Sequence, residues 1–244
     1  MELKGKIALV TGSAKRVGRA ISLGLASSGC QMALHYLHSA AEARRLRRQV
    51  REKDVAADIF KADLGISTQI GVLIEEVTNR FGRIDVLINN AAVCYATPWG
   101  NIKESDWDLF MDTNLKSTFL LSQAVSQFML SNDGGKIIHL ADIGGFRPWP
   151  GYVPYCVSKA GVIALTQGMA KALAPSIQVN AIAPATVLPS EDSSEEEVER
   201  LRRQIPLDRI GSPEDIVQTV LYLLGGTDFI TGQVVVVDGG RSIY

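Results

Sequence analysis

The sequence predicts one α/β domain, 1–244, in which a parallel sheet carries helices on both faces. Short apolar segments alternate with longer periodic segments along the whole chain, as expected for strands joined by helical crossovers. Glycines, asparagines or acids follow several apolar segments, at the edge where such a sheet binds ligands. Right-handed crossovers then favour a doubly wound Rossmann fold with seven parallel strands in the order 3-2-1-4-5-6-7.

The composition is that of an ordinary globular protein, with 46% hydrophobic and 21% charged residues. A net charge of −1 gives no reason to expect nucleic acid or an anionic membrane as a partner. No apolar run approaches the roughly 18 residues that cross a bilayer, and no signal peptide is expected. Cys30, Cys94 and Cys156 are scattered, which predicts reduced thiols without disulfides or a metal. We therefore expect a cytoplasmic protein that acts on a small molecule.

Seven apolar segments are predicted to form the strands of the sheet. In chain order they are 7–11, 31–36, 55–64, 84–88, 136–141, 177–182 and 234–237. The segments between them are predicted as helices. These follow Gly18, begin after Ser39, cover 67–81 and 105–130, open at Tyr155, and cover 213–224. Ser39 and Ser212-Pro213 are start signals, and Gly29 is a stop signal.

Two of the connecting segments carry unusual charge. The helix after Ser39 is strongly basic, and its charged face either is only solvated or steers an anionic cofactor. The segment 185–210 holds a run of acids followed by arginines and is predicted as a loop with a short amphipathic helix. Because it follows the sixth strand, we expect it to overhang the substrate side as a lid.

The turn after the first strand predicts a phosphate site. It runs Gly12-Ser13-Ala14-Lys15-Arg16-Val17-Gly18. Gly12 suits a tight turn, Gly18 lets a helix approach the sheet or a pyrophosphate, and the helix N-terminus offers free N–H groups. A merely structural turn has the same appearance, so the position of the turn in the first βα unit is what favours a dinucleotide.

The end of the second strand favours NADP(H) over NAD(H). An acid there would bind the ribose 2′-hydroxyl and repel a 2′-phosphate. The residues present are His35, Tyr36, His38 and Ser39, and no acid appears before Glu42. Imidazole and hydroxyl groups can donate to phosphate, and Lys15 and Arg16 add positive charge. The alternative is that these residues only form a turn and a helix cap.

Three further strand ends are expected to line the cofactor. Asp63 and Leu64 suit the edge and face of an adenine, although a helix-capping Asp is as good an explanation. Asn90, Ala91 and Ala92 follow the fourth strand. Pro184, Thr186 and Val187 follow the sixth strand, where backbone groups and the Thr186 hydroxyl suit a nicotinamide carboxamide.

Asp142, Tyr155 and Lys159 are the candidates for the chemistry. Tyr155 and Lys159 share one helix face at i and i+4. A phenol has a reference pKa of about 10, and an ammonium about 4 Å away would favour phenolate by roughly 4 kcal/mol before desolvation. That would bring Tyr155 close to physiological pH, where a proton donor is most useful. An ionised Asp142 would oppose this shift, so we expect Asp142 and Tyr155 to titrate as a coupled pair.

With these motifs placed, the whole chain resembles the short-chain dehydrogenase/reductase family. The resemblance rests on Gly12 through Gly18, Asn89-Asn90-Ala91, Asn114 and Tyr155-x-x-x-Lys159. It implies that Tyr155 donates or accepts the proton and that Lys159 binds nicotinamide ribose and lowers the Tyr pKa. It also implies that Asn114 holds a proton-relay water, and that the long central helix and the Tyr155 helix build a homotetramer.

Two departures from the common family pattern resemble pteridine reductases. Arg16 replaces the middle glycine of the turn, and Asp142 replaces a Ser thirteen residues before Tyr155. Segment 34–43, Tyr95-x-Thr97-Pro98 and Gly151-Tyr152 are also similar to theirs. This resemblance implies reduction of a dihydropterin- or dihydrofolate-like ring by NADPH. Arg16, Cys94, Asp142 and Tyr155 would then contact the substrate.

Two other positions keep a second substrate class open. Cys94 stands where pteridine reductases stack a Phe on the pterin, and Ala92 stands where they have a Ser. A carbonyl reductase acting on a ketone or 3-ketoacyl group is therefore the alternative, with Asp142 in the role of the Ser. A third alternative, a scaffold without catalysis, is disfavoured because Asn114, Tyr155 and Lys159 are all present.

The sequence does not decide which side chains form the wall of the substrate site. Cys94 is better explained as a small apolar filler than as a reactive thiol. An aromatic wall could come from Tyr95, Trp99, Phe146, Trp149 or Tyr152, each of which suits packing equally well.

Overall fold

The computed structural model describes residues 1–189 and 193–243. Its seven parallel strands form one sheet in the order β3-β2-β1-β4-β5-β6-β7. The strands are β1 (Ile7–Val10), β2 (Gln31–Tyr36), β3 (Ala57–Lys61), β4 (Val86–Asn89), β5 (Gly135–Leu140), β6 (Ile177–Pro184) and β7 (Val234–Val237). The predicted fold class and strand order are confirmed.

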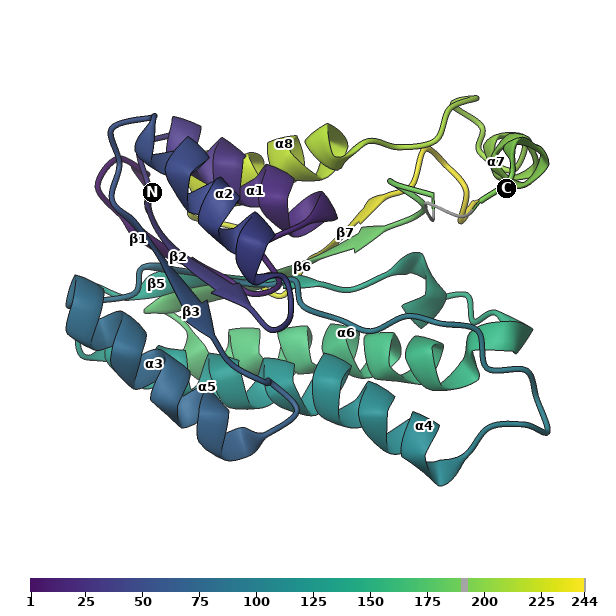
Figure 1. Cartoon of the computed structure of the whole chain (residues 1–244), viewed down its shortest axis with the longest axis horizontal. Helices are drawn as coiled ribbons and strands as arrows, with labels where there is room; N and C mark the ends of the chain where they lie inside the picture. The colour runs from purple at the N-terminus through teal and green to yellow at the C-terminus, as the bar shows by residue number, and fades with distance from the viewer. Residues whose placement is uncertain (190–192, 244) are drawn as a thin grey trace.

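Helices cover both faces of the sheet (Figure 1). They are α1 (Arg16–Ser27), α2 (Ala40–Arg51), α3 (Ser67–Phe81), α4 (Glu104–Phe110), α5 (Ser117–Leu130), α6 (Val153–Leu173), α7 (Glu195–Arg202) and α8 (Pro213–Gly225). The helices α1, α2 and α8 lie on one face, and α3, α5 and α6 lie on the other. Each layer buries its own apolar cluster because the strands are apolar on both faces, as in other parallel sheets.

The central strand β1 pairs with β2 on one side and with β4 on the other. The strand order therefore runs outward from β1 in one direction through β2 and β3 and in the other through β4 and β5. The connections that follow β1 and β4 lead to opposite sides of this point. A crevice opens at the carboxyl ends of strands at such a point. This is where the glycine-rich turn, the end of β4 and the end of β5 come together.

The predicted long helix 105–130 is interrupted by a π-helical segment, Met111–Lys116, between α4 and α5. Single π-turns of this kind are rare in proteins as a whole, and those that occur often lie at functional sites. The segment contains Asn114, which is 1% exposed. Hydrophobic periodicity cannot reveal such a turn, because the chain continues as one helix on either side of it.

Five of the seven strands begin or end one to three residues away from the predicted bounds, and two of these differences have a visible cause. β3 begins at Ala57 rather than at residue 55, because Asp54 adopts a φ of 58° that turns the chain after α2. β6 continues two residues past the predicted end at 182, because its last residues pair with β7 as far as Pro184 and Val237. The extension carries Pro184 to the edge of the crevice.

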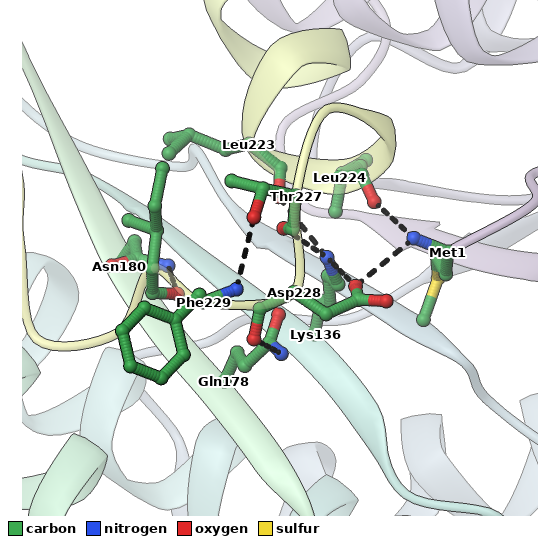
Figure 2. A network of polar contacts seen from close by, with 10 residues as sticks. Met1, Lys136, Gln178, Asn180, Leu223, Leu224, Thr227, Asp228 and Phe229 are labelled. Atoms are coloured by element: carbon green, nitrogen blue, oxygen red, sulfur yellow. Dashed lines mark hydrogen bonds and ion pairs between the residues drawn. The ribbon is translucent and has the colours of Figure 1, made fainter.

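The opposite edge of the sheet is closed by a polar network (Figure 2). The ammonium of Lys136, at the start of β5, donates to the carbonyl oxygens of Leu223 at 3.3 Å and Thr227 at 3.2 Å. It also pairs with Asp228 at 2.7 Å, and the amino group of Met1 contacts the same carboxylate at 3.1 Å. The contacts satisfy a Lys that is 4% exposed and tie α8 to the sheet, far from the crevice.

No helix in the described part of the chain has both the length and the apolar character needed to span a bilayer.

Candidate active site at the carboxyl edge of the sheet

Two adjoining cavities open at the carboxyl edge of the sheet. One, of about 790 Å³, follows the glycine-rich turn and the ends of β2 to β5, and we call it the glycine cleft. The other, of about 610 Å³, lies between Asp142 and the segment after β6, and we call it the Asp142 pocket. Arg16, Val17 and Tyr155 line both cavities.

The glycine-rich turn packs so closely that its glycines cannot be replaced without movement. Gly12 has a φ of +60°, and a Cβ there would lie 3.0 Å from the Cα of Ala91. A Cβ on Gly18 would lie 2.5 Å from the Nδ2 of Asn90 and closer still to the carbonyl oxygen of Gly12. The first turn of α1 has no side-chain cap, so its N–H groups are available to an anion.

Hydrogen bonds join the end of β4 to the glycine-rich turn. The amide of Asn90 donates to the carbonyl oxygens of Thr11 at 2.8 Å and Gly12 at 3.1 Å. The hydroxyl of Thr11 accepts from the backbone N–H groups of Asn90 and Ala91. The wall that contains Asn90, Ala91 and Ala92 is thereby held against the turn, and all three residues line the glycine cleft.

His35 supports the turn from below. Its Nε2 lies 3.0 Å from the carbonyl oxygen of Ala62, which can only accept, and its Nδ1 accepts from the N–H of Gly12 at 3.1 Å. Burial lowers the pKa of His35, so the ring is neutral. The prediction that His35 donates a hydrogen bond to a phosphate is therefore wrong, because both ring nitrogens already bond to groups within the protein.

The far end of the glycine cleft carries Lys15 and His38, whereas Tyr36 and Ser39 do not line it. The ammonium of Lys15 pairs with Glu42 at 2.9 Å. This exposed pair holds the pKa of Glu42 below its ordinary value through the hydrogen bond from Lys15. Ser39 precedes α2 as predicted, but its hydroxyl makes no capping hydrogen bond.

Asp63 and Leu64 line the same cleft at the end of β3. Asp63 does not cap α3, because the residue before that helix is Ile66. Its Oδ1 accepts from the N–H of Gly65 at 2.9 Å and so shapes the turn. The helix-capping alternative for Asp63 is therefore wrong.

Asp142 and Tyr155 form a hydrogen-bonded pair where the two cavities meet. The Tyr155 hydroxyl donates to Oδ2 of Asp142 at 2.9 Å, and Oδ1 of Asp142 accepts from the N–H of Gly144 at 2.7 Å. Burial raises the pKa of Asp142 above its ordinary value, against the opposing hydrogen bond from Gly144 and the charge of Lys159. Burial and the Asp142 carboxylate raise the pKa of Tyr155 well above 10.

Lys159 lies behind this pair rather than against the phenol oxygen. Its Nζ donates to the carbonyl oxygen of Leu140 at 2.7 Å and lies 5.8 Å from the centre of the Tyr155 ring. Burial lowers the pKa of Lys159, with Asp142 opposing. The expectation that Lys159 brings the pKa of Tyr155 toward neutrality is thus wrong for this arrangement, in which desolvation and Asp142 outweigh the ammonium.

The side chain of Asn114 is held in place by hydrogen bonds. Its Oδ1 accepts from the N–H of Val93 at 2.8 Å, and its Nδ2 donates to the carbonyl oxygen of Val93 at 3.0 Å and to the Ser158 hydroxyl at 3.1 Å. These bonds join the π-helical segment to the strand end after β4 and to α6. The Asn114 amide therefore fixes these three segments relative to one another. Its part in a water relay stays a prediction.

A family model described as enoyl-(acyl carrier protein) reductase matches residues 12–242. The chain belongs to the short-chain dehydrogenase/reductase family. The 3-oxoacyl-[acyl-carrier-protein] reductase FabG of Staphylococcus aureus is 37% identical over 239 residues, covering 96% of this chain and 97% of that protein. The 3-oxoacyl-[acyl-carrier-protein] reductase of Synechocystis is 35% identical over 248 residues, covering 99% of each.

A doubly substituted short-chain dehydrogenase/reductase from Serratia marcescens has the same fold, with a TM-score of 0.93 at 33% identity. The match covers 99% of this chain and 100% of that one. The Staphylococcus and Synechocystis proteins are named as 3-oxoacyl reductases, and these comparisons give no support to the narrower pteridine resemblance.

In this short-chain dehydrogenase/reductase, the wall of the Asp142 pocket is aromatic on one side. Trp149 and Tyr152 line it, and the Trp149 ring lies nearly parallel to that of Tyr155, at 15° and 6.4 Å. Tyr95 packs on Phe110 and donates to Asp106, and Trp99 lines a separate groove. Of the five aromatic residues that the sequence left open, Trp149 is thus the one stacked on Tyr155.

Cys94 lines the Asp142 pocket and carries no thiolate. Cys94 is an exposed residue, but partial loss of water around its sulfur, together with the nearby Asp142 carboxylate, raises the pKa of Cys94 to about 11. A thiol with this pKa is a poor nucleophile near neutral pH.

The predicted nicotinamide contacts divide between the two cavities. Pro184 lines the glycine cleft, whereas Thr186 and Val187 line the Asp142 pocket. The hydroxyl of Thr186 accepts from Arg241 at 3.1 Å. Arg16, with a φ of 49°, donates to the carbonyl oxygens of Leu188 at 2.8 Å and Pro189 at 3.2 Å. Arg16 therefore joins the glycine-rich turn to the segment after β6.

Sequence reasoning missed three charged residues of the Asp142 pocket, Glu197, Arg200 and Arg241. The first two belong to α7, whose path over the sheet cannot be deduced from its pattern. Arg241 follows the Asp238-Gly239-Gly240 turn at the end of β7. The rule that strand ends converge in a parallel sheet was a signal that could have found it.

Proposed function

We propose that this protein is an NADPH-dependent reductase that converts a carbonyl group to an alcohol. One observation carries the proposal: Tyr155, an O–H donor held by Asp142, lines both the glycine cleft and the Asp142 pocket. A proton donor at the junction of a dinucleotide-sized cleft and a substrate-sized pocket is what carbonyl reduction needs. The 3-oxoacyl reductase names of the relatives support the same reaction class.

The residues of the glycine cleft fit NADP(H). The turn from Gly12 to Gly18 and the uncapped N-terminus of α1 would hold the pyrophosphate. Lys15 and His38 would hold the 2′-phosphate, and Asp63 and Leu64 would hold the adenine. Lys159 and Pro184 would lie along the nicotinamide end. The cofactor, when bound, supplies a hydride to the substrate carbon.

The protein's own part in the reaction is to deliver the proton. The raised pKa of Tyr155 keeps its proton in place until negative charge develops on the substrate oxygen. The raised pKa of Asp142 makes a protonated carboxyl accessible, which could then donate to the phenol oxygen or to the substrate. The positive charge of Lys159 favours the tyrosinate that proton transfer leaves behind.

A ring C=N bond, as in a dihydropterin, is the second candidate substrate. Asp142 favours it, because a carboxylate accepts from the N–H donors of such a ring where a Ser would not do so as strongly. Trp149 also offers the flat face that the Cys94 position lacks.

An NADPH-oxidation assay distinguishes the two candidates. The panel contains acetoacetyl-CoA, simple ketones, dihydrobiopterin and dihydrofolate. Turnover of carbonyl compounds alone supports the primary proposal, and turnover of pterins alone would replace it with the second. Replacing NADPH by NADH in the same assay tests the cofactor preference.

The role of Tyr155 makes a direct prediction. Tyr155→Phe removes the proton donor but keeps the ring that packs between Trp149 and Phe110. We expect kcat to fall by on the order of 10²- to 10⁴-fold, with the Kd for NADPH changed by less than about threefold. Unchanged turnover in this variant would falsify the mechanism.

A further inference from the structure

Arg241 is a charged group of the Asp142 pocket that the proposed reaction does not use. It lies in the last segment of the chain, after β7, and its guanidinium lines the pocket beside Asp142 and Trp149. Its carbon centre lies 5.9 Å from the centre of the Trp149 ring, and its charge lowers the pKa of Asp142. It therefore lies close to the atoms where a substrate would react.

The fold holds Arg241 in place with neutral partners. Nη1 donates to the Thr186 hydroxyl at 3.1 Å, and Nη2 donates to the Gln204 side-chain oxygen at 2.9 Å. A guanidinium has five N–H donors, so other donors remain for a ligand. Because neither partner carries a charge, these bonds fix the side chain without neutralising it.

The turn that carries Arg241 is itself tightly built. Both oxygens of Asp238 accept backbone N–H groups of the turn, from Gly240 at 2.8 Å and Ser242 at 2.6 Å. Gly239 and Gly240 adopt φ values of 64° and 91°, which an L side chain rarely adopts. The turn thereby fixes the backbone position from which the Arg241 side chain reaches the pocket.

The charge balance of the Asp142 pocket is positive. Among the described residues that line it, Arg16, Arg200 and Arg241 are cationic, and Asp142 and Glu197 are acidic. Asp142 accepts the hydrogen bond from the Tyr155 hydroxyl, and burial raises the pKa of Asp142 and so disfavours its charged form. An anionic group in this pocket would meet arginine forks, which match carboxylate geometry.

We infer that the substrate is a keto acid whose carboxylate, a few bonds from the reacting carbonyl, is bound by Arg241. The inference rests on the proposed function and narrows it. The Trp149 ring lies 5.9 Å from the Arg241 guanidinium carbon and 6.4 Å from the Tyr155 ring, and this arrangement favours a short spacing between the two substrate groups. A 3-oxoacyl thioester is uncharged near its reacting carbonyl and would offer Arg241 no charged partner.

Matched substrate pairs test the inference. The probes are 4-oxopentanoate and its methyl ester, and acetoacetate and its methyl ester, with acetoacetyl-CoA as a thioester. We expect wild-type kcat/KM to be at least about tenfold higher for each acid than for its ester. Arg241→Gln should lower kcat/KM for the acids by on the order of 10- to 100-fold and change it for the esters by less than about threefold.

Two further variants separate binding from a structural role. Arg241→Lys keeps the charge and should recover part of the preference for the acids. Arg147→Gln removes an exposed arginine that does not line the pocket and should leave all ratios unchanged. Equal losses for acid and ester in Arg241→Gln, or no acid preference in the wild type, would overturn the inference.

Calorimetry with the NADP⁺-loaded protein keeps this result distinct from failure of the proposed function. If no carbonyl compound is reduced, the proposed function fails. Binding of 4-oxopentanoate by the wild type but not by Arg241→Gln would still support an anion site at Arg241. Absence of binding to both proteins would overturn it.

Discussion

At the scale of single residues, the main departure from a serine-based reductase site is the pair of Asp142 and Tyr155. A serine hydroxyl can donate to a carbonyl without titrating, whereas Asp142 can do so only when it is protonated. Burial favours the protonated form of Asp142, because it raises the pKa of Asp142 against the opposing hydrogen bond from Gly144. The same burial keeps Tyr155 protonated, so the two groups share one proton-rich site.

Asp142→Asn tests this account through stability. A folded-state pKa above the ordinary 3.8 means that the stability contribution of Asp142 is present below pH 3.8 and is lost as the pH rises through the raised pKa. Above its raised pKa the wild type therefore carries the cost of a buried carboxylate, which the Asn variant avoids. We expect the variant to have the higher free energy of unfolding at pH 7 and this advantage to shrink toward pH 5. Urea unfolding at both pH values measures it, and an advantage that grows toward low pH contradicts the account.

Cofactor preference is also decided by single residues. Lys15 is the residue that we propose for the 2′-phosphate, and it is already paired with Glu42. Both side chains are about half exposed, at 56% and 43%, so water and salt screen the pair and a phosphate can compete for the ammonium.

Glu42→Gln should therefore strengthen NADPH binding. Removing the competing carboxylate leaves Lys15 to the 2′-phosphate, and we expect the Kd for NADPH to fall by about two- to fivefold. The Kd for NADH should stay the same, and the gain should diminish in high salt. Fluorescence titration measures both constants, with the exposed Glu75→Gln as the control. An equal gain for NADH would show that Glu42 does not act on the phosphate.

At the scale of elements, the site depends on how closely α1 approaches the ends of β1 and β4. Gly18 begins the contact, since a Cβ there would press on Gly12 and Asn90. His35 and Thr11 hold the same turn from the sides. The glycine that the sequence assigns to a pyrophosphate approach is thus first required by packing within the protein.

Gly18→Ala should displace α1 from the crevice. We expect the free energy of unfolding to fall by about 1–3 kcal/mol and the Kd for NADPH to rise at least about tenfold. Gly71→Ala is the matched control, because a Cβ at this helical glycine of α3 meets nothing within 4 Å. That variant should gain about 0.4–1 kcal/mol and bind NADPH normally. Thermal unfolding and cofactor titration measure both variants, and a Gly18→Ala protein that keeps wild-type affinity would refute the packing argument.

At the scale of the whole molecule, the homotetramer expected from the family stays a prediction. Phe119 and Leu130 lie about three turns apart on one face of α5 and are 41% and 47% exposed. Val157 on the neighbouring α6 is 42% exposed. Large apolar side chains exposed together in this way are typical of surfaces that pack against another chain.

Light scattering after gel filtration tests this surface. We expect a mass of about four times the chain mass of 26.4 kDa for the wild type. The double variant Phe119→Glu with Leu130→Glu should give a smaller species, because the charges would have to be buried in the interface. Val72→Glu, on an exposed position of α3, is the control and should keep the wild-type mass. A monomer in all three proteins would reject the tetramer.

The sequence by itself determined the elements and their order. Apolar segments of strand length between periodic segments predict a doubly wound sheet, and the strand-end rule places Gly12, Asn89, Asp142 and Pro184 at one edge. These features are local or follow from the handedness of crossovers, so they can be derived without coordinates.

Only the tertiary structure decided how the side chains at that edge use their hydrogen bonds. His35 turned inward to Gly12 and Ala62, Lys159 turned to the Leu140 carbonyl, and Arg241 entered the pocket from the end of the chain. Burial then reversed the expected direction of the Tyr155 pKa. Partners and desolvation depend on residues far apart in the chain, and spacing along a sequence carries no information about them.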